Sequence, residues 1–515
     1  MADVVYRGNL KAASFPFLSE LFGRSIIVRG QDQNYIPGLA AKDAIDSVAG
    51  IPQIYYCHNV IPTDSGYKSI GYEEYSAPAY PSTAGFGAVL VIRDDAGNSA
   101  LFTTDAVGNC YVMETGTSVW SAPATPPAAA SIAGKRVTVS FVSGITYIYF
   151  EKVGCYKYDF GTNAMSAVTL TGITSTDILG LVGNAGYLLA YSVDALAWSS
   201  TTDPTDFTPS LTTGAGGGNV EGVRGTIVTV EEVYGGVIIF ASDNAVAAQY
   251  SGNPRYPYNF TAIPGAGGLA DPNYITADVG SGTLYAYTES GLQSITLKSA
   301  TTVFPEVTDF LSGSLFEDYN EATDLLELID GSGVSIQKRV VLVADRYVVI
   351  SYGIESLTHA LYYDISYKQW GRLKIVHTDC FEFMQYPNSI TELPKRSIAF
   401  STSGGGIYVL NSDIVNSDAH GVMLLGKFQY VRSRFLQLQE VDFENVNQGD
   451  TFSMSLLPSL DGKNFEPIVS GYLQESNGKF RKYRFHNTAL NHTLVCKGAF
   501  NATSIVLTFN AAGGR

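Results

Sequence analysis

The sequence has little charge. Asp, Glu, Lys and Arg make up 16% of its 515 residues, whereas ordinary globular proteins contain roughly 25%. Hydrophobic residues make up 45% of the chain, so it can bury a full core, which excludes wholesale disorder. Glycine (52 residues), tyrosine (33) and phenylalanine (26) are abundant. Because aromatic residues favour strands and glycine favours turns, this composition predicts an all-β fold.

Long apolar runs are also missing. No stretch approaches the run of about 18 apolar residues that a membrane-spanning helix needs, so no span is predicted. Residues Met1–Arg24 contain no apolar run between a basic start and a cleavage site. A signal peptide is therefore not predicted either.

The cysteines are few and widely separated. They form no C-x-x-C pair, which predicts neither a disulfide framework nor a zinc site. We expect the thiols to be buried as small apolar side chains in a reducing compartment. The five are Cys57, Cys110, Cys155, Cys380 and Cys496.

Catalytic motifs are absent from the sequence. No histidine has the H-E-x-x-H or H-x-H spacing of a metal site, and neither a P-loop nor a G-x-S-x-G turn before a helix is found. The stretches Gly214–Gly218 and Gly265–Gly268 are predicted to be flexible connections. The sequence therefore predicts no catalytic, cofactor-binding or metal-binding residue, and no cofactor. The six histidines are His58, His359, His377, His420, His486 and His492.

A repeated unit of short strands begins near residue 85. Each copy has an apolar run, a turn of Gly, Asn or Asp and a second apolar run, and the copies recur every ~40–50 residues, which is typical of propeller blades. One blade cannot bury both of its faces alone, so the copies must pack around an axis. We predict a β-propeller of about seven blades over residues 85–420. The copies are Ala88–Met113, Arg136–Phe160, Asp177–Ser200, Thr226–Tyr250, Tyr274–Leu297, Asp324–Trp370 and Arg396–Asp413.

Two different segments flank the predicted propeller. Prolines and glycines interrupt residues 1–84, which predicts an extended N-terminal arm, with a short helix near Ala40–Val48 and a strand that leads into the propeller. Residues 421–515 alternate apolar and polar residues, which predicts a small C-terminal β-sandwich or barrel. This last segment has ten Lys/Arg against seven Asp/Glu, a net charge of +3, so the total of −16 leaves −19 for residues 1–420. An acidic surface repels nucleic-acid phosphates.

Three further segments invite a chemical interpretation. Ser459–Phe465 resembles the Asp-box turn of sialidase propellers, but it lies outside the repeats, and arginines are sparse where a sialidase needs a cluster of them. Lys479–Arg484 predicts a strand with a basic outer face. The alternatives are a contact with nucleic acid or sugar, or with an acidic neighbouring subunit. The acidic run Glu317–Asp330 predicts a solvated strand pair with a turn.

Two stretches resemble a known family. Asn59–Tyr75, NVIPTDSGYKSIGYEEY, is similar to the N-V-x-P-T-x-x-G-Y-x-S-x-x-G motif of the tail nozzle proteins of short-tailed, double-stranded-DNA bacteriophages. Trp198–Phe207, WSSTTDPTDF, resembles a W-S-x-x-x-D-P-x-x-F turn in the propellers of that family. The layout of a propeller followed by a small β-domain fits the same family.

The resemblance implies a structural virion protein that is not an enzyme. Six copies would form a ring or tube in the tail, below the portal and its adaptor proteins. Packaged DNA would pass through this channel without sequence-specific binding. The family retains the packaged genome and docks fibres, spikes or a needle. The implied location is the phage tail of the virion, after assembly in the host cytoplasm.

Two other functions stay open at this point. A propeller lectin would bind receptor sugars, but lectins usually repeat the same aromatic and polar residues in each blade. This chain has only three tryptophans, Trp120, Trp198 and Trp370, and no such repeated set. A glycan-cleaving propeller enzyme is the other alternative. The assembly state and a test of glycan turnover discriminate among the three functions.

Overall fold

The computed structural model of the chain consists mainly of antiparallel β-strands. Helix is scarce among the described residues: it comprises α1 (Ala129–Ile132), two short 3-10 turns, Ser175–Asp177 and Pro272–Tyr274, and the isolated helical residues Val307 and Leu311. The structure describes residues 3–9, 54–63, 66–75, 87–114, 119–253, 256–278, 282–303, 307, 311, 315–320, 325–330, 337–343, 346–354, 356–367, 369–385, 395–403, 406–411, 421–429, 436–445, 452–459, 469–476, 480–489 and 491–511.

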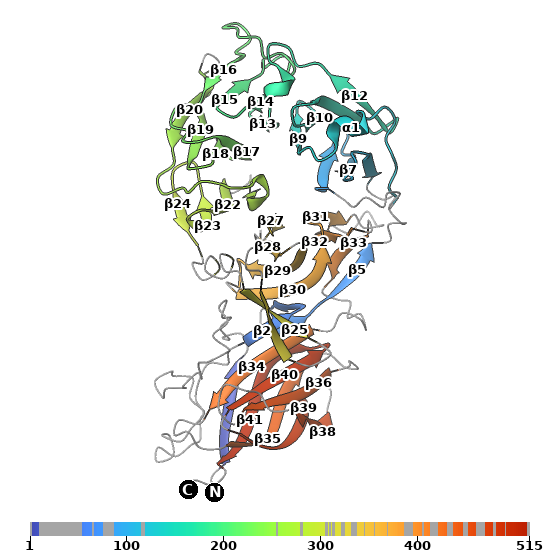
Figure 1. Cartoon of the computed structure of the whole chain (residues 1–515), viewed down its shortest axis with the longest axis vertical. Coiled ribbons are helices and arrows are strands. Elements are labelled where there is room, and N and C mark those ends of the chain that lie inside the picture. The colour runs from blue at the N-terminus through green and yellow to red at the C-terminus, as the bar shows by residue number, and fades with distance from the viewer. Residues whose placement is uncertain are drawn as a thin grey trace.

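Seven sheets, counted over these residues, form a ring that confirms the predicted β-propeller (Figure 1). The first contains β6 (Leu90–Arg93), β7 (Ser99–Thr104) and β8 (Cys110–Glu114). The second and third contain β9 (Val137–Val142), β10 (Ile145–Phe150), β11 (Gly154–Asp159) and β12 (Ala164–Val168), then β13 (Gly180–Asn184), β14 (Tyr187–Tyr191), β15 (Ala195–Trp198) and β16 (Gly216–Asn219).

The next two sheets repeat the same four-stranded pattern. The fourth contains β17 (Ile227–Val233), β18 (Gly236–Ala241), β19 (Ala245–Tyr250) and β20 (Tyr258–Ala262). The fifth contains β21 (Ile275–Asp278), β22 (Thr283–Thr288), β23 (Gly291–Ile295) and β24 (Ala300–Thr302).

The last two blades draw on more distant parts of the chain. The sixth contains β27 (Gln337–Val343), β28 (Tyr347–Gly353), β29 (Leu357–Asp364) and β30 (Gln369–His377). The seventh contains β31 (Asp379–Gln385), β32 (Lys395–Ser401), β33 (Ile407–Asn411) and, from the N-terminal segment, β5 (Gly71–Tyr75). A separate hairpin of β25 (Leu315–Asn320) and β26 (Leu325–Asp330) is inserted before the sixth blade.

Tight turns connect the first two strands of the second and third blades, as the glycine pattern predicts. At Ser143–Gly144 both residues have positive φ, 53° and 79°, and Ala185–Gly186 repeats this at 51° and 83°. Two successive left-handed residues are the requirement of the type I′ turn, whose twist matches that of a hairpin. The second strand of each hairpin then enters the core, and all six residues of β18 are buried.

Neighbouring blades are held together by apolar side chains from their facing sheets. Between the fourth and fifth blades, Ile238 and Phe240 of β18 pack with Leu284 of β22. The first and seventh blades pack in the same way, through Leu101 of β7 and Phe381 of β31. Asp379 also accepts a hydrogen bond from the backbone N–H of Val89, at 2.8 Å, across this boundary. The ring is therefore closed by packing, although the two blades lie at opposite ends of the repeat region.

The C-terminal part forms two sheets that pack face to face. One contains β2 (Ile54–His58), β34 (Gly421–Gln429), β40 (Asn491–Gly498), β36 (Phe452–Ser459) and β37 (Val469–Ser470). The other contains β41 (Asn501–Ala511), β35 (Leu436–Asn445), β39 (Phe480–Ala489) and β38 (Tyr472–Ser476), with β1 (Asp3–Asn9) paired to β41. Tyr483 of β39 packs on Phe452 of β36, with ring centroids 6.0 Å apart.

The described residues of the N-terminal segment are strands that pair with several different sheets. They form β1 and β2 in the C-terminal part, β3 (Val60–Pro62) and β4 (Tyr67–Ser69) at the junction, and β5 in the propeller. The strands β2 to β5 are only three to five residues long, which is why prolines and glycines can separate them. The predicted helix near Ala40–Val48 lies outside the described residues.

Candidate functional site

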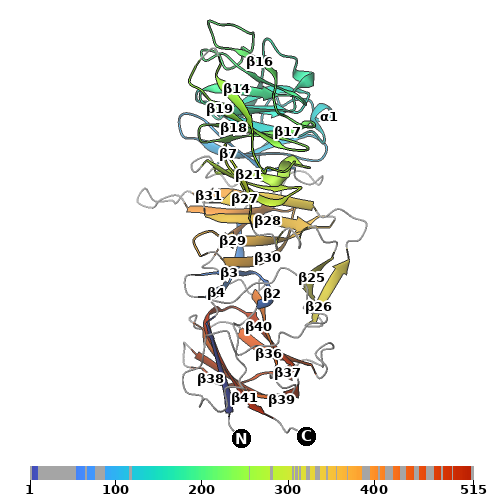
Figure 2. The same ribbon diagram turned by 90° about the vertical axis from the view of Figure 1, so that its left-hand side faces the viewer.

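A continuous sheet joins the propeller to the C-terminal part. Its strand order is β27-β28-β29-β30-β3-β4-β41-β35-β39-β38. The two short strands β3 and β4 make the connection, because Val60 pairs with Arg372 of β30 and Tyr67 pairs with Ala502 of β41. Figures 1 and 2 show this arrangement, with the C-terminal part extending from the outer edge of the sixth blade.

Asn59 fixes the chain where it turns from one body to the other. Its φ is 52°, a left-handed conformation that asparagine tolerates better than most residues. Its side-chain Oδ1 accepts hydrogen bonds from Tyr72 Oη at 2.9 Å and from the backbone N–H of Lys374 at 3.0 Å. Its carbonyl accepts a third, from Ile70 at 2.8 Å. One buried residue thus binds the N-terminal segment to blade six.

Ser69 makes the equivalent connection on the side of the C-terminal part. Its backbone N–H donates to the carbonyl of Phe500 at 2.8 Å, and its hydroxyl accepts from the Phe500 N–H at 2.8 Å. Gly421 lies directly beside it, since a Cβ at Gly421 would come within 2.5 Å of the Ser69 Cβ. A side chain at residue 421 would therefore push the two bodies apart.

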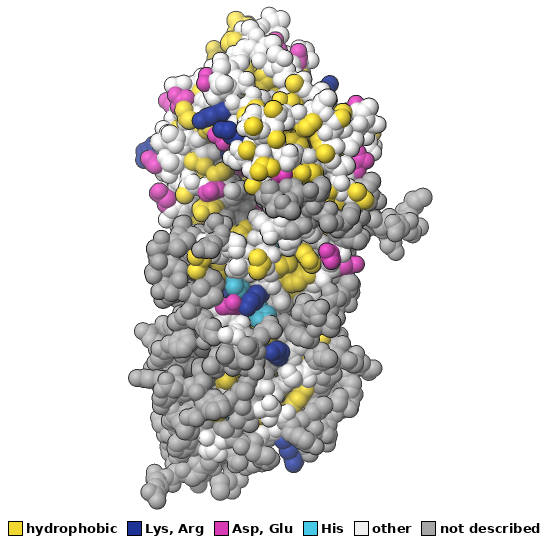
Figure 3. All heavy atoms as spheres, turned by 45° about the vertical axis from the view of Figure 1, so that its right-hand side comes forward, with side chains coloured by type: hydrophobic (Ala, Val, Ile, Leu, Met, Phe, Trp, Pro, Cys, Tyr) yellow, Lys and Arg dark blue, Asp and Glu magenta, His cyan; other side chains and the backbone are white. Residues whose placement is uncertain are grey.

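Asp318 of the inserted hairpin binds both bodies at once. Its Oδ1 lies 2.7 Å from Lys374 Nζ of β30 and 3.3 Å from His359 Nε2 of β29, and it accepts from Tyr56 Oη of β2 at 3.1 Å. Figure 3 shows acidic, basic and histidine side chains gathered at this junction. Because one carboxylate oxygen receives three donors from three strands, we call this group the Asp318 cluster.

Two buried histidines at the junction are neutral at physiological pH: His359 of the Asp318 cluster, and His58, whose Nδ1 lies 3.2 Å from Tyr56 Oη. Burial lowers the pKa of His359 to about 4, although its hydrogen bond to Asp318 acts in the other direction. Burial, together with the charges of Lys374 and Arg372, lowers the pKa of His58 to about 3. Burial also opposes ionisation of Asp318, but the hydrogen bonds from His359 and Lys374 outweigh it and hold the pKa of Asp318 below its usual range. A neutral His359 that donates from Nε2 can accept at Nδ1, where Thr358 Oγ1 lies 2.9 Å away.

Aromatic rings surround the charges of this cluster. The buried Arg372 guanidinium lies 4.6 Å from the ring centroid of Tyr56 and 5.8 Å from that of Tyr352. Tyr319, next to Asp318, is 1% exposed and packs with Tyr56 and Val422 in the apolar cluster of the C-terminal part. The hairpin therefore inserts one apolar and one charged side chain side by side. The polar atoms of the Asp318 cluster bind one another, so the cluster is built as a structural connection between the two bodies.

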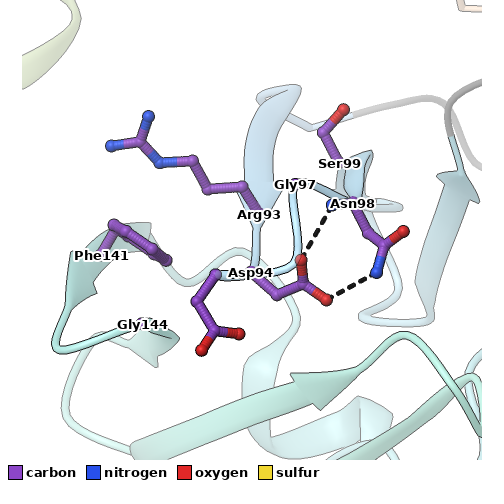
Figure 4. Close-up of a pocket in the computed structure, with 8 residues that line it drawn as sticks. Arg93, Asp94, Gly97, Asn98, Ser99, Phe141 and Gly144 are labelled. Atoms are coloured by element: carbon purple, nitrogen blue, oxygen red, sulfur yellow. Dashed lines mark hydrogen bonds between the residues drawn. The ribbon is translucent and has the colours of Figure 1, made fainter.

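A second candidate site is a notch at the turns of the first two blades. A cavity of about 540 Å³ is lined by residues from the β6–β7 turn and from β9 and its turn (Figure 4). Arg93 lies over the ring of Phe141, with its guanidinium carbon 4.5 Å from the centroid. The lining residues are Arg93, Asp94, Asp95, Gly97, Asn98, Ser99, Phe141 and Gly144.

Several sequence predictions are confirmed by burial. All five cysteines are buried with free thiols. In the basic strand, Tyr483 and Phe485 are buried while Arg484 between them is exposed, as an aromatic inner face and a basic outer face require. The Asp-box-like segment Ser459–Phe465 falls, beyond its first residue, outside the described residues. Within the described part of the chain, no three His, Cys, Asp or Glu side chains are grouped as a metal site, and no helix there is long and apolar enough to cross a membrane.

One of the two predicted flexible connections is instead a strand. Residues Gly216–Asn219, within the supposed flexible stretch, form the outer strand β16, and a Cβ at Gly216 would come within 3.3 Å of the Trp198 ring. Gly268 lies against the Ser242 carbonyl, which a Cβ would approach to 1.8 Å. At Gly216 and Gly268 the absence of a side chain allows the backbone to pack closely against its neighbours.

The acidic run also differs from the prediction of a solvated pair. Its strands do form the hairpin, but Asp318 and Tyr319 point into the junction. The only sequence signal was a tyrosine next to an aspartate inside an acidic run, which is too weak to identify a buried contact.

The Trp198–Phe207 motif reaches both sides of the third blade, because Trp198 packs against the fourth blade and Phe207 against the second. Phe207 is 1% exposed and packs with Tyr149 and Leu188. The Trp198 indole N–H donates to the Gly214 carbonyl at 2.9 Å, and the Ser200 N–H donates to the Asp206 carbonyl at 2.7 Å. The motif therefore folds a long loop back onto its own blade.

No family model matches the sequence, and no curated protein matches it. Among solved structures, the chain is similar to YCF48 from Cyanidioschyzon merolae, with 12% identity over 67% of this chain and 99% of that one, at a TM-score of 0.41. It is also similar to the WD40 β-propeller domain of Doa1, with 9% identity over 66% and 97% of the two chains, at a TM-score of 0.40. A third similarity is to the β-propeller domain of Cps50 (Swd1) from Myceliophteria thermophila, with 10% identity over 66% and 99%, at a TM-score of 0.39. The strand pairing and the packing between blades described above define this chain as an all-β propeller protein.

Proposed function

We propose that this chain is a structural, non-enzymatic subunit of the tail of a short-tailed, double-stranded-DNA bacteriophage. Six copies form a ring or tube that extends the DNA-exit channel and retains the packaged genome. The subunit meets portal or adaptor proteins on one side, and fibre, spike or needle proteins around or below it. DNA passes through without sequence-specific binding.

The observation that supports this role most is the continuous sheet from β27 to β38. Domains joined only by a linker move relative to one another by default. Here backbone pairing runs from the inner strand of blade six to the far edge of the C-terminal part, and the Asp318 cluster binds the same two bodies a second time. Such a body transmits force with little hinge motion, as a tail under internal pressure requires.

The resemblance motif Asn59–Tyr75 coincides with this connection. Hydrogen bonds of its residues Asn59, Ser69 and Tyr72 join the N-terminal segment to two places. One is blade six, and the other is Phe500, the residue that precedes β41. A motif built for rigidity between two bodies fits a structural subunit. The charge of −19 on residues 1–420 against +3 on residues 421–515 suits an ordered contact between neighbouring copies.

The test is the assembly state of the full chain. Native mass spectrometry and negative-stain imaging should show sixfold rings, and an antibody should label the tail vertex of phage particles. Arg484→Glu reverses an exposed charge in the basic C-terminal part and should raise the fraction of monomer. Arg224→Glu makes the same change in net charge on the propeller and serves as the control.

Two results would count against the proposal. A chain that stays monomeric at all concentrations and is absent from particles would refute it. Hydrolysis of bacterial glycans by the purified chain would instead favour the enzyme alternative.

A further inference from the structure

The edge of the C-terminal sheet at β41 is covered by two separate strands. β4 pairs with two residues of this edge, Asn501 and Ala502, while β1 pairs with the seven residues from Ser504 to Asn510. An uncovered strand edge exposes unpaired backbone N–H and C=O groups, which are a template for aggregation. The sheet is therefore complete only when a β1 strand lies along β41.

The pairing of β1 with β41 is specific in register. Tyr6 lies opposite Leu507 of β41, and Leu507 lies opposite Val441 of β35. Val441 in turn lies opposite Tyr483 of β39. Directly opposite residues share one face of a sheet, and Tyr483 is 3% exposed and packs on Phe452 of the other sheet. β1 thus completes the inner face, and a slip of one residue would move Tyr6 to the outer face.

A long connection follows β1 in the sequence. Residues 10–53, 44 in all, separate it from β2, whereas β2, β3, β4 and β5 follow one another with one to four residues between them. When extended, a connection of this length spans about 150 Å, whereas β41 with its 11 residues is about 37 Å long. Among the described strands β1 pairs with β41 alone. The connection is long enough for that β41 to belong to another copy of the chain.

We infer that β1 of each copy pairs with β41 of the neighbouring copy when the chain assembles. The seven residue pairs are the same whether β1 comes from the same copy or from a neighbour. Exchange of an identical element is a low-cost route to association, and head-to-tail exchange gives a ring when the rotation between copies closes. The inference rests on the proposed ring and names the contact that holds its copies together.

The exchanged strand has more to contribute between copies than within one. The propeller and the C-terminal part are already joined by β3, β4 and the Asp318 cluster, so β1 adds nothing to that connection. Between copies it adds a strand to the sheet of the next subunit, a mode of association in which backbone hydrogen bonds supply the affinity. The inner-face register then selects this edge over other strand edges.

The experiment is disulfide trapping across this pairing in the full chain. Val5 lies opposite Thr508, and directly opposite residues of antiparallel strands have Cα atoms about 4.5–5.5 Å apart, a separation that a disulfide spans. The variant Val5→Cys with Thr508→Cys is assembled, oxidised, blocked with N-ethylmaleimide in urea and run on a non-reducing denaturing gel. The native thiols are buried and are blocked only after oxidation. Val5→Cys with Ser504→Cys is the matched control, because Ser504 lies opposite Asn9, four residues along β1 from Val5.

Most of the double variant should run as disulfide-linked dimers and larger species, up to a complete ring, while the control should run as a monomer. The two single variants, Val5→Cys and Thr508→Cys, should also give a linked dimer when they are expressed together, because their thiols meet only between copies.

Native mass spectrometry of the reduced double variant separates the two ways in which this experiment can fail. A protein that assembles but gives only monomer bands, with an internal disulfide or with none, would overturn the inference and leave the proposed ring standing. A chain that stays monomeric under all conditions would refute the proposed function, and the exchange with it.

Discussion

Acidification should destabilise this protein well above the pH at which most carboxylates titrate. Three buried histidines carry this prediction: His58, with its pKa lowered to about 3, and His359 and His377, with theirs lowered to about 4, in each case mainly by burial. In the unfolded chain each histidine has a pKa of about 6.5. Between pH 6.5 and about 4 the unfolded state therefore binds more protons than the folded state, so the free energy of unfolding falls as the pH falls.

The magnitude follows from these differences. At pH 5 each histidine is about 1.5 pH units below its unfolded pKa, which corresponds to about 2 kcal/mol at about 1.4 kcal/mol per unit. The three together should lower the free energy of unfolding by about 6 kcal/mol between pH 7 and pH 5. Glu232 acts in the opposite direction, because burial raises its pKa and the folded state takes up its proton first, but it is one group against three.

The assay is urea denaturation of the full chain at pH 7, 6 and 5. The denaturation midpoint should fall at each step, and most steeply below pH 6. His359→Gln keeps a donor near Asp318 but cannot titrate, so it should remove about 2 kcal/mol of the difference between pH 7 and pH 5. Equal stability at pH 7 and pH 5 would show that these histidines are exposed to solvent or protonated in the folded state, and would refute the reasoning.

Three other predictions test the packing. Asp318→Asn should lower the free energy of unfolding by about 1–3 kcal/mol, since it leaves Lys374 without its charged partner. Asp95→Asn, in an exposed turn, should change the free energy of unfolding little. Denaturation curves of the two variants test this difference. Gly217→Ala should destabilise the third blade, because its Cβ would come within 2.7 Å of the neighbouring strand, while Gly218→Ala has nothing within 4 Å and should be neutral in a melting-temperature comparison. The five buried thiols should react slowly with a thiol reagent in the native protein and quickly in urea, and fast labelling of the native protein would contradict their burial.

The propeller could be predicted because its signal is periodic. Every blade repeats an apolar run, a turn and a second apolar run, and turns such as Ser143–Gly144 need glycine for local reasons that the sequence alone displays. The charged residues gave no such signal. Asp318 could be placed only once the chain had folded, because its partners Tyr56 and Lys374 are 262 and 56 residues away from it.

Short strands and glycines account for most of the remaining errors. β3 and β4 have three residues each, too few to show an alternating pattern, and their partners lie hundreds of residues further along the chain. The Gly216–Asn219 strand has almost no side chains, so composition suggested a flexible connection. Only the structure shows that Gly216 of this strand packs against the Trp198 ring. The notch residues also escaped prediction, because Arg93 and Phe141 belong to different blades.

The position of the N-terminal strands has a consequence for biosynthesis. Val60 pairs with Arg372, Tyr75 with Ile407 and Tyr67 with Ala502, so these residues must wait for partners that are made more than 300 positions later. Contacts of such large sequence separation slow folding and leave strand edges unpaired in the meantime. The early blades can pair as soon as their strands are made, whereas blade seven must wait for β33 and the junction for β41. A chain truncated near its C-terminus would therefore keep much of its core and yet fail to complete the body, so unfinished copies would be excluded from any assembly.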